Sequence, residues 1–203
     1  SEADLTGAIA VTDAARQSSV PKVAFEALER GESLLDDDAN YSERRRVGAA
    51  WHRLGRSCRL QDEVDSALWA FRKALPMLIG DPRFMGVTYH DIGEIHAERG
   101  EWPEAVELYR RAVKLKSEGG GPQVDRTSTL IALGRALLSS NDREGALEAY
   151  ADCQAILNSL PERDLGREVL LLEDLGNLKS REDNAVEAAE LFGRAVATAR
   201  EAD

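Results

Sequence analysis

The side chains with the most distinctive chemistry are three arginines and a histidine near the start of the second quarter of the chain. Arg45, His52, Arg56 and Arg59 are separated by seven, four and three residues, which places them on one face of a helix. Guanidinium groups bind carboxylates in two-point contacts, and each charge-assisted hydrogen bond contributes about 1.5–3 kcal/mol where water is excluded. The stripe therefore predicts a site for an acidic ligand.

The segment around this stripe differs in charge from the rest of the protein. Residues 41–75 contain eight Lys and Arg residues against four Asp and Glu residues, whereas the full chain of 203 residues carries a formal charge of −11. A second interpretation remains open, in which these arginines pair with Glu43, Asp62 or Asp65 on the helix surface. Such exposed pairs contribute only about 0.3–0.5 kcal/mol each.

A repeated pattern of small and aromatic residues indicates which elements position the stripe. A glycine is followed after twelve residues by alanine, after four more by an aromatic residue, and after three more by alanine or cysteine. The four sets are Gly55, Ala67, Phe71, Ala74; Gly93, Ala105, Tyr109, Ala112; Gly134, Ala146, Tyr150, Cys153; and Gly176, Ala188, Phe192, Ala195. Apolar residues recur at helical spacing on both sides of a short break in each set, so each set predicts a helical hairpin.

The expected architecture is an all-α stack of five antiparallel hairpins. The expected helices of the four clear units are 43–60 with 63–78, 83–99 with 102–116, 123–140 with 143–158, and 164–180 with 184–201. Before residue 41 the pattern weakens, but 3–17 and 20–35 still have helical periodicity, and we interpret 1–40 as a degenerate first unit. The chain is thus predicted to be one domain, residues 1–203, divided into units at 1–40, 41–81, 82–121, 122–160 and 161–203.

The sequence from Trp51 through Leu54 and Gly55 to Ala67, Phe71 and Ala74 resembles the tetratricopeptide repeat. Successive glycines lie 38, 41 and 42 residues apart, more than the 34 usual in that family, so the chain resembles its longer-unit members. These include kinesin light chains, spindle-orientation adaptors and bacterial peptide-sensing regulators. The resemblance implies a right-handed superhelical solenoid in which the first helix of each unit lines a concave groove.

The groove implied by this resemblance adds six residues to the stripe of the second unit. They are Arg83, His90 and Glu94 in the third unit, Ile131 and Arg135 in the fourth, and Asn177 in the fifth. The groove would be cationic at the second and third units, partly apolar at the fourth, and acidic or amide-bearing at the fifth. An acidic segment with an apolar anchor would fit it.

No residue pattern predicts catalysis, a metal or a cofactor. His90 and His96 lie on different helical faces, and no carboxylate or cysteine supplies a ligand pattern around them, so no metal site is expected. His52 and His90 could be neighbours across the groove, where hydrogen-bonding or surface roles are favoured over metal binding. The run Asp36-Asp37-Asp38 lacks the spacing of a calcium loop, and the glycines at 119–121 lack the lysine of a phosphate loop.

Charge and hydropathy limit the partners and the compartment. A pI near 4.9 argues against nucleic acid and anionic membranes, because phosphate would be repelled. No stretch is long enough to span a bilayer and no signal peptide is recognised. Cys58 and Cys153 occupy packing positions of the repeat, so we expect free thiols in a reducing, cytoplasmic compartment.

Three functions are compatible with the sequence. The first is a non-catalytic scaffold that binds a protein or peptide segment in its groove. The second is a regulatory or sensor segment of a larger signalling or transcription-regulating protein. The third is a self-association module that forms a homo-oligomer through the alanine-rich last helix.

Overall fold

A computed structural model describes residues 2–17, 21–35 and 40–201, and the acidic run at 36–38 lies outside them. This part of the chain contains ten α-helices and one short 3₁₀ helix, and no β-strand. The helices are α1 (Glu2–Gln17), α2 (Pro21–Ser33), α3 (Tyr41–Leu60), α4 (Val64–Met77), α5 (Pro82–Glu98), α6 (Trp102–Glu118), η1 (Gln123–Arg126), α7 (Thr127–Ser139), α8 (Arg143–Ser159), α9 (Leu165–Arg181) and α10 (Ala185–Glu201).

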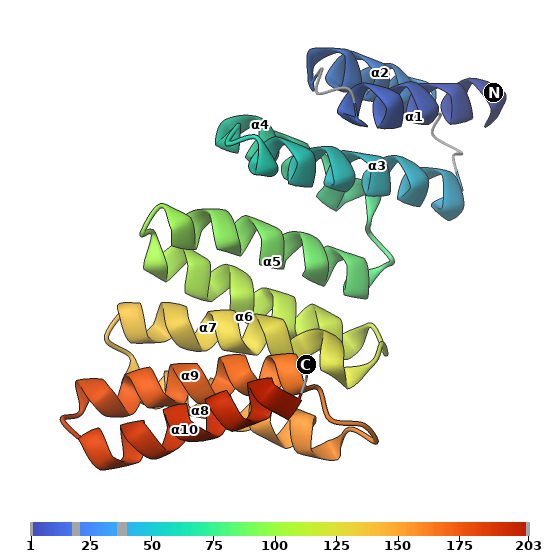
Figure 1. The fold of residues 1–203 in the computed structure, drawn as a ribbon. Helices are drawn as coiled ribbons and strands as arrows, with labels where there is room; N and C mark the ends of the chain where they lie inside the picture. Colours follow the sequence, from blue (N-terminus) through green and yellow to red (C-terminus); the bar gives the residue numbers. More distant parts are fainter. Residues whose placement is uncertain (1, 18–20, 36–39, 202–203) are drawn as a thin grey trace.

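The helices pair into five hairpins that follow one another in chain order. The closest packing in the fold joins α5 to α6, α9 to α10, α3 to α4, α7 to α8 and α1 to α2. Figure 1 shows these pairs as successive layers, with α1 and α2 at one end of the stack and α9 and α10 at the other. The predicted all-α stack of hairpins is confirmed. One expected helix differs at its start, where Pro122 is followed by the 3₁₀ turn η1 before α7 begins.

Successive first helices touch one another, and this identifies the inner side of the stack. α1 contacts α3, α5 contacts α7, and α7 contacts α9. The backbones of successive second helices approach less closely in the described chain, although side chains of α2 and α4 meet, as in the ion pair of Lys73 with Glu32 at 3.1 Å. Layers that approach on one side and separate on the other curve toward the side of contact. We therefore call the surface formed by α3, α5, α7 and α9 the inner face.

The repeated glycines allow the two helices of a hairpin to approach closely. A Cβ atom placed on Gly55 would lie 2.7 Å from the Phe71 ring, and one on Gly93 would lie 2.8 Å from the Tyr109 ring. Since real Cβ atoms essentially never come this close, the aromatic ring of each second helix occupies the space that a first-helix side chain would need. Gly134 with Tyr150 and Gly176 with Phe192 repeat the arrangement.

The turns within the last four hairpins share a left-handed residue two positions after the end of the first helix. That residue is Asp62, Gly100, Asn141 or Asp183, with φ between 56° and 74°. In each turn the next amide donates to a carbonyl five residues back, as from Glu63 to Cys58, which satisfies the last carbonyls of the helix. This regular turn keeps the first helices in register across the stack.

Packing around Trp51 shows how a hairpin is covered by the unit before it. Trp51 has no exposed surface, and its ring lies 6.0 Å from Phe25 and 5.1 Å from Trp69, measured between centroids. Phe25 comes from α2, the second helix of the preceding unit. Among the described helices, none is long and apolar enough to cross a membrane.

Candidate ligand groove

The inner face carries the residues that the sequence singled out, and most of its cations are paired with the next unit. Arg45 Nε donates to Asp81 Oδ2 at 2.7 Å, and Arg59 lies 2.9 Å from Glu94 and 2.8 Å from Glu98. Arg83 pairs with Asp125 in the same way. The partners therefore lie about one repeat further along the chain. A comparison of each groove cation with the residues one repeat downstream would have found them.

Glu43 and Asp65, which the sequence offered as surface partners for these arginines, contact other groups instead. Glu43 belongs to the N-terminal cap of α3, where it accepts from the Asn40 amide at 3.1 Å. Asp65 pairs with Arg99 of the next unit at 2.8 Å.

Burial alone would raise the pKa of Asp81, but the hydrogen bonds from Arg45 and from the Phe84 amide outweigh it and lower that pKa.

His52 lies beneath the groove surface and is held by two polar neighbours from α5. It is only 3% exposed. Its Nδ1 lies 3.1 Å from Thr88 Oγ1, and its Nε2 lies 3.3 Å from Asp91 Oδ2. Burial, together with the charges of Arg56 and Arg53, lowers the pKa of His52 to about 4. The imidazole is therefore neutral at pH 7.

The contacts of Thr88, His52 and Asp91 have the connectivity of a hydroxyl, a base and an acid. Thr88 has no exposed surface, and its hydroxyl also lies 3.1 Å from the Phe84 carbonyl as a donor. A nucleophile must reach a substrate carbonyl or phosphoryl group. This hydroxyl is enclosed by the stack and cannot reach such a group.

Of the predicted groove cations, Arg56 is the least engaged by other residues of the protein. Its side chain is 62% exposed, and its Nε lies 3.9 Å from Asp91 Oδ2. That carboxylate is already closer to His52, at 3.3 Å. The guanidinium of Arg56 thus keeps most of its donors directed to solvent.

Next to Asp91, the inner face holds two further polar residues that the sequence assigned to the groove. His90 Nε2 lies 3.5 Å from Glu94 Oε1. His90, Asp91 and Glu94 offer ligand atoms that all lie within 4.8 Å of one another. No metal site was expected here, although a histidine followed by carboxylates at the next and the fourth position is visible in the sequence.

Arg135 lines two cavities, one between the fourth and fifth units and one between the third and fourth units. One has a volume of about 440 Å³ and is lined by Leu138, Asn177, Arg181 and their neighbours. The other has a volume of about 340 Å³, and Trp102 and Ala132 form part of its wall. Arg135 itself donates to Asp174 Oδ2 at 2.7 Å. Ile131, by contrast, is 3% exposed and packs in the core.

Arg181 is a cation in the first of these cavities that the sequence did not single out. No carboxylate partner is found for it among residues 40–201. It follows the last groove position of α9, close to the turn at Asp183. Because Arg181 is the last residue of α9, the groove positions predicted from the central face of each helix did not include it.

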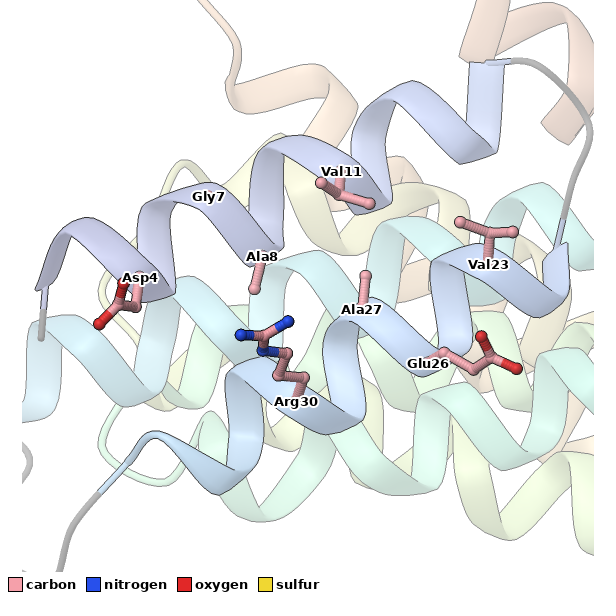
Figure 2. A pocket seen from close by; sticks show the side chains of 8 residues that line it. All are labelled: Asp4, Gly7, Ala8, Val11, Val23, Glu26, Ala27 and Arg30. Carbon is pink, nitrogen blue, oxygen red and sulfur yellow. The ribbon is translucent and has the colours of Figure 1, made fainter.

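A further cavity lies outside the groove, on the outer surface of the first hairpin. Its volume is about 510 Å³. Figure 2 shows Ala8 and Val11 of α1 and Val23 and Ala27 of α2 around the hollow between the two helices. Val11 is 49% exposed and Val23 43% exposed. The first hairpin thus presents an open apolar surface.

Comparison with known proteins gives this arrangement of hairpins a family. Residues 84–159 match the sequence profile of the tetratricopeptide repeat. Over this part of the chain, the hairpins are tetratricopeptide repeats. No curated protein sequence matches the chain.

Solved structures resemble the chain over nearly its whole length. BtubC from P. vanneervenii has a TM-score of 0.74 at 16% identity, over 98% of this chain and 91% of the other. MamA 41-end from Desulfovibrio magneticus RS-1 has a TM-score of 0.70 at 14% identity, over 98% and 97%. Kinesin light chain TPR-like repeats from Podospora anserina have a TM-score of 0.68 at 18% identity, over 98% and 96%. At these identities the similarity establishes the fold.

Proposed function

We propose that the five hairpins act as one non-catalytic scaffold domain that binds a protein segment along its inner face. The observation that carries this proposal is the pair of cavities beside Arg135. They lie next to each other and differ in character, since Trp102 and Ala132 line one while Asn177 and Arg181 line the other. An extended segment could therefore place an apolar side chain in the first and a carboxylate in the second.

The cations available to such a segment are those without a close partner. Arg181 and Arg56 meet this condition, whereas Arg45, Arg59 and Arg83 are engaged by acids of the next unit. A segment that bound one of these engaged arginines would first have to break its existing ion pair. This would lower the net gain in binding free energy. We therefore propose that Arg181 and Arg56 bind carboxylates, with Asn177 donating an additional hydrogen bond, and that the ligand is an acidic segment with an apolar anchor.

A defined probe tests this proposal directly. The probe is a fluorescein-labelled peptide with one leucine flanked by glutamates, and its control has glutamine at every glutamate. Fluorescence anisotropy should detect binding of the acidic peptide alone, weakening as salt is raised. The substitutions R181E and R56E should each lower the affinity about tenfold or more, while R194E, on the exposed part of α10, makes the same charge change outside the groove. Equal affinities for the three variants would refute the groove.

The regulatory alternative predicts the same use of the inner face, so the peptide experiment tests its binding step as well. A regulatory segment would also work in the same compartment as a scaffold. Cys58 and Cys153 are free and buried, which supports our proposal of a reducing, cytoplasmic environment.

We also propose, as a second function, self-association in which α10 of one copy enters the outer cavity of the first hairpin of another. The first unit aligns with the second when Ala24, Leu28 and Gly31 are matched to Ala67, Phe71 and Ala74. In this alignment Val11 corresponds to Leu54. Leu54 is 1% exposed because the preceding unit covers it, whereas Val11 is 49% exposed. The outer cavity thus corresponds to the place where a preceding second helix packs in the interior of the stack.

The last helix has a surface suited to this place. Val186 is 73% exposed and Val196 is 52% exposed, and Ala189 lies between them on the exposed side of α10. Such a contact is heterologous, so a single substitution on either surface blocks chain growth. V23E and V186E should each sediment as monomers, and an equal mixture should form dimers because each variant keeps one intact surface. A wild-type monomer at high concentration would eliminate self-association without affecting the peptide proposal.

A further inference from the structure

Four ligand-forming side chains gather where α3 and α5 meet on the inner face. They are His52 from α3 and His90, Asp91 and Glu94 from α5. The ligand atoms of the three α5 residues lie within 4.8 Å of one another. His52 Nε2 joins them at 3.3 Å from Asp91 Oδ2, and His90 Nε2 lies 3.5 Å from Glu94 Oε1.

One ligand atom of this cluster, Asp91 Oδ2, is buried without a hydrogen-bond partner. Asp91 is only 7% exposed, so water does not readily serve its carboxylate. Buried polar atoms in native proteins are nearly always paired, and an exception calls for an explanation such as a bound ion. The unpartnered carboxylate oxygen faces the histidines of the cluster, which are themselves metal ligands.

We propose that His52, His90, Asp91 and Glu94 bind one divalent transition-metal ion of the zinc class. Zinc takes four nitrogen, oxygen or sulfur ligands at about 2.0–2.2 Å in a tetrahedron, so neighbouring ligand atoms lie about 3.3–3.5 Å apart. The two measured separations, 3.3 Å and 3.5 Å, match this edge length. Small rotations of the α5 side chains would bring the remaining pairs together.

The surroundings of His52 have the form that supports a metal ligand. A ligating imidazole usually donates its other N–H to a fixed acceptor, which sets its orientation. His52 Nδ1 lies 3.1 Å from Thr88 Oγ1, and the Thr88 hydroxyl lies 3.1 Å from the Phe84 carbonyl. The chain from carbonyl to hydroxyl to imidazole holds Nε2 toward Asp91.

Two arginines beside the cluster compete with a cation, and both can yield. Arg59 contacts Glu94 at 2.9 Å but also contacts Glu98 at 2.8 Å. It therefore keeps a carboxylate partner when Glu94 turns to the metal. Arg56 is 62% exposed and lies 3.9 Å from Asp91, so its guanidinium can move into solvent.

Titration of the chelator-treated full chain with Zn²⁺ in a calorimeter tests the site without any peptide. We expect one ion per chain, and Co²⁺ in its place should give the visible absorption of a tetrahedral complex. H90Q and E94Q should each weaken binding by about 100-fold or more, since even outer-shell changes cost about 10–100-fold. H96Q is the matched control, because His96 pairs with Glu101 away from the cluster, and it should bind as the wild type does.

A further variant separates this site from adventitious binding to acidic surface groups. R59Q leaves all four ligands in place and removes a competing charge, so it should bind Zn²⁺ about tenfold more tightly. Circular dichroism confirms that each variant is folded. Absence of stoichiometric binding by the wild type, or equal weakening in H90Q and H96Q, would overturn the proposal.

Discussion

Replacing Gly134 by alanine should disrupt the closest approach between two helices in the stack. A Cβ atom at this position would meet three atoms of the Tyr150 ring, all of them nearer than real Cβ atoms approach. Tyr150 is 1% exposed, so its ring cannot turn into solvent to make room. The helices must separate or the ring must leave its rotamer.

The size of the effect follows from two opposing contributions. Overpacking of a well-packed site costs about 1–3 kcal/mol, and this site should lie near the upper value because the obstacle is a buried ring. Alanine recovers about 1 kcal/mol through its better helix propensity. We therefore expect Gly134→Ala to lower the free energy of unfolding by about 2 kcal/mol.

Gly193 provides the matched control, because it is also a helical glycine but has no atom within 4 Å of the position of a new Cβ. Gly193→Ala should raise the free energy of unfolding by up to about 1 kcal/mol. The two variants should then differ by about 3 kcal/mol, or roughly 6–12 °C in melting temperature. Thermal melting followed by circular dichroism measures this difference. Equal melting temperatures would refute the assignment of Gly134 as a steric requirement.

Three further outcomes follow from the ionisable groups and the turns. The pKa of His52 is about 4 in the folded protein and 6.5 in the unfolded chain, so stability should fall by about 3 kcal/mol as the pH drops through this interval. Urea titrations should show this loss in the wild type and not in His52→Gln. Asp183 has a φ of 56°, and Asp183→Gly should raise the melting temperature slightly, because glycine adopts this conformation without the side-chain penalty, whereas Asp183→Ala should not. Burial raises the pKa of Cys58 to about 11 and that of Cys153 to about 12, so Ellman's reagent at neutral pH should label both only after denaturation, and rapid labelling of the native protein would contradict their burial.

The hairpins were predictable because they depend on local rules that recur four times. The interval between Gly55 and Phe71 is set by the length of one helix and one turn, and the structure places the ring directly over the glycine. The same holds for the left-handed turn at Asn141, where a short polar residue tolerates positive φ. Each of these features can be recognised within a single unit.

The contacts between units were harder to predict, because they join residues about 40 positions apart. The pair of Arg45 with Asp81 and that of Arg135 with Asp174 span 36 and 39 residues. A helical stripe identifies which side chains share a face but does not identify the opposing face of the next unit. For the same reason the depth of His52 was not predicted, since α5 rather than α3 covers it.

These contacts between units distinguish the groove residues that maintain the stack from those available to a ligand. Arg45 donates a hydrogen bond to Asp81, which lies at the start of α5. Asp81 also caps that helix by accepting from the Phe84 amide. Loss of Arg45 would therefore weaken the junction of two units whether or not a ligand is present. Arg56 lies on the same stripe, but the acid opposite it is already closer to His52. Since Arg56 is 62% exposed and lies 3.9 Å from that carboxylate, its guanidinium has donors left for a partner. Position on the helix alone would have treated Arg45 and Arg56 as equivalent.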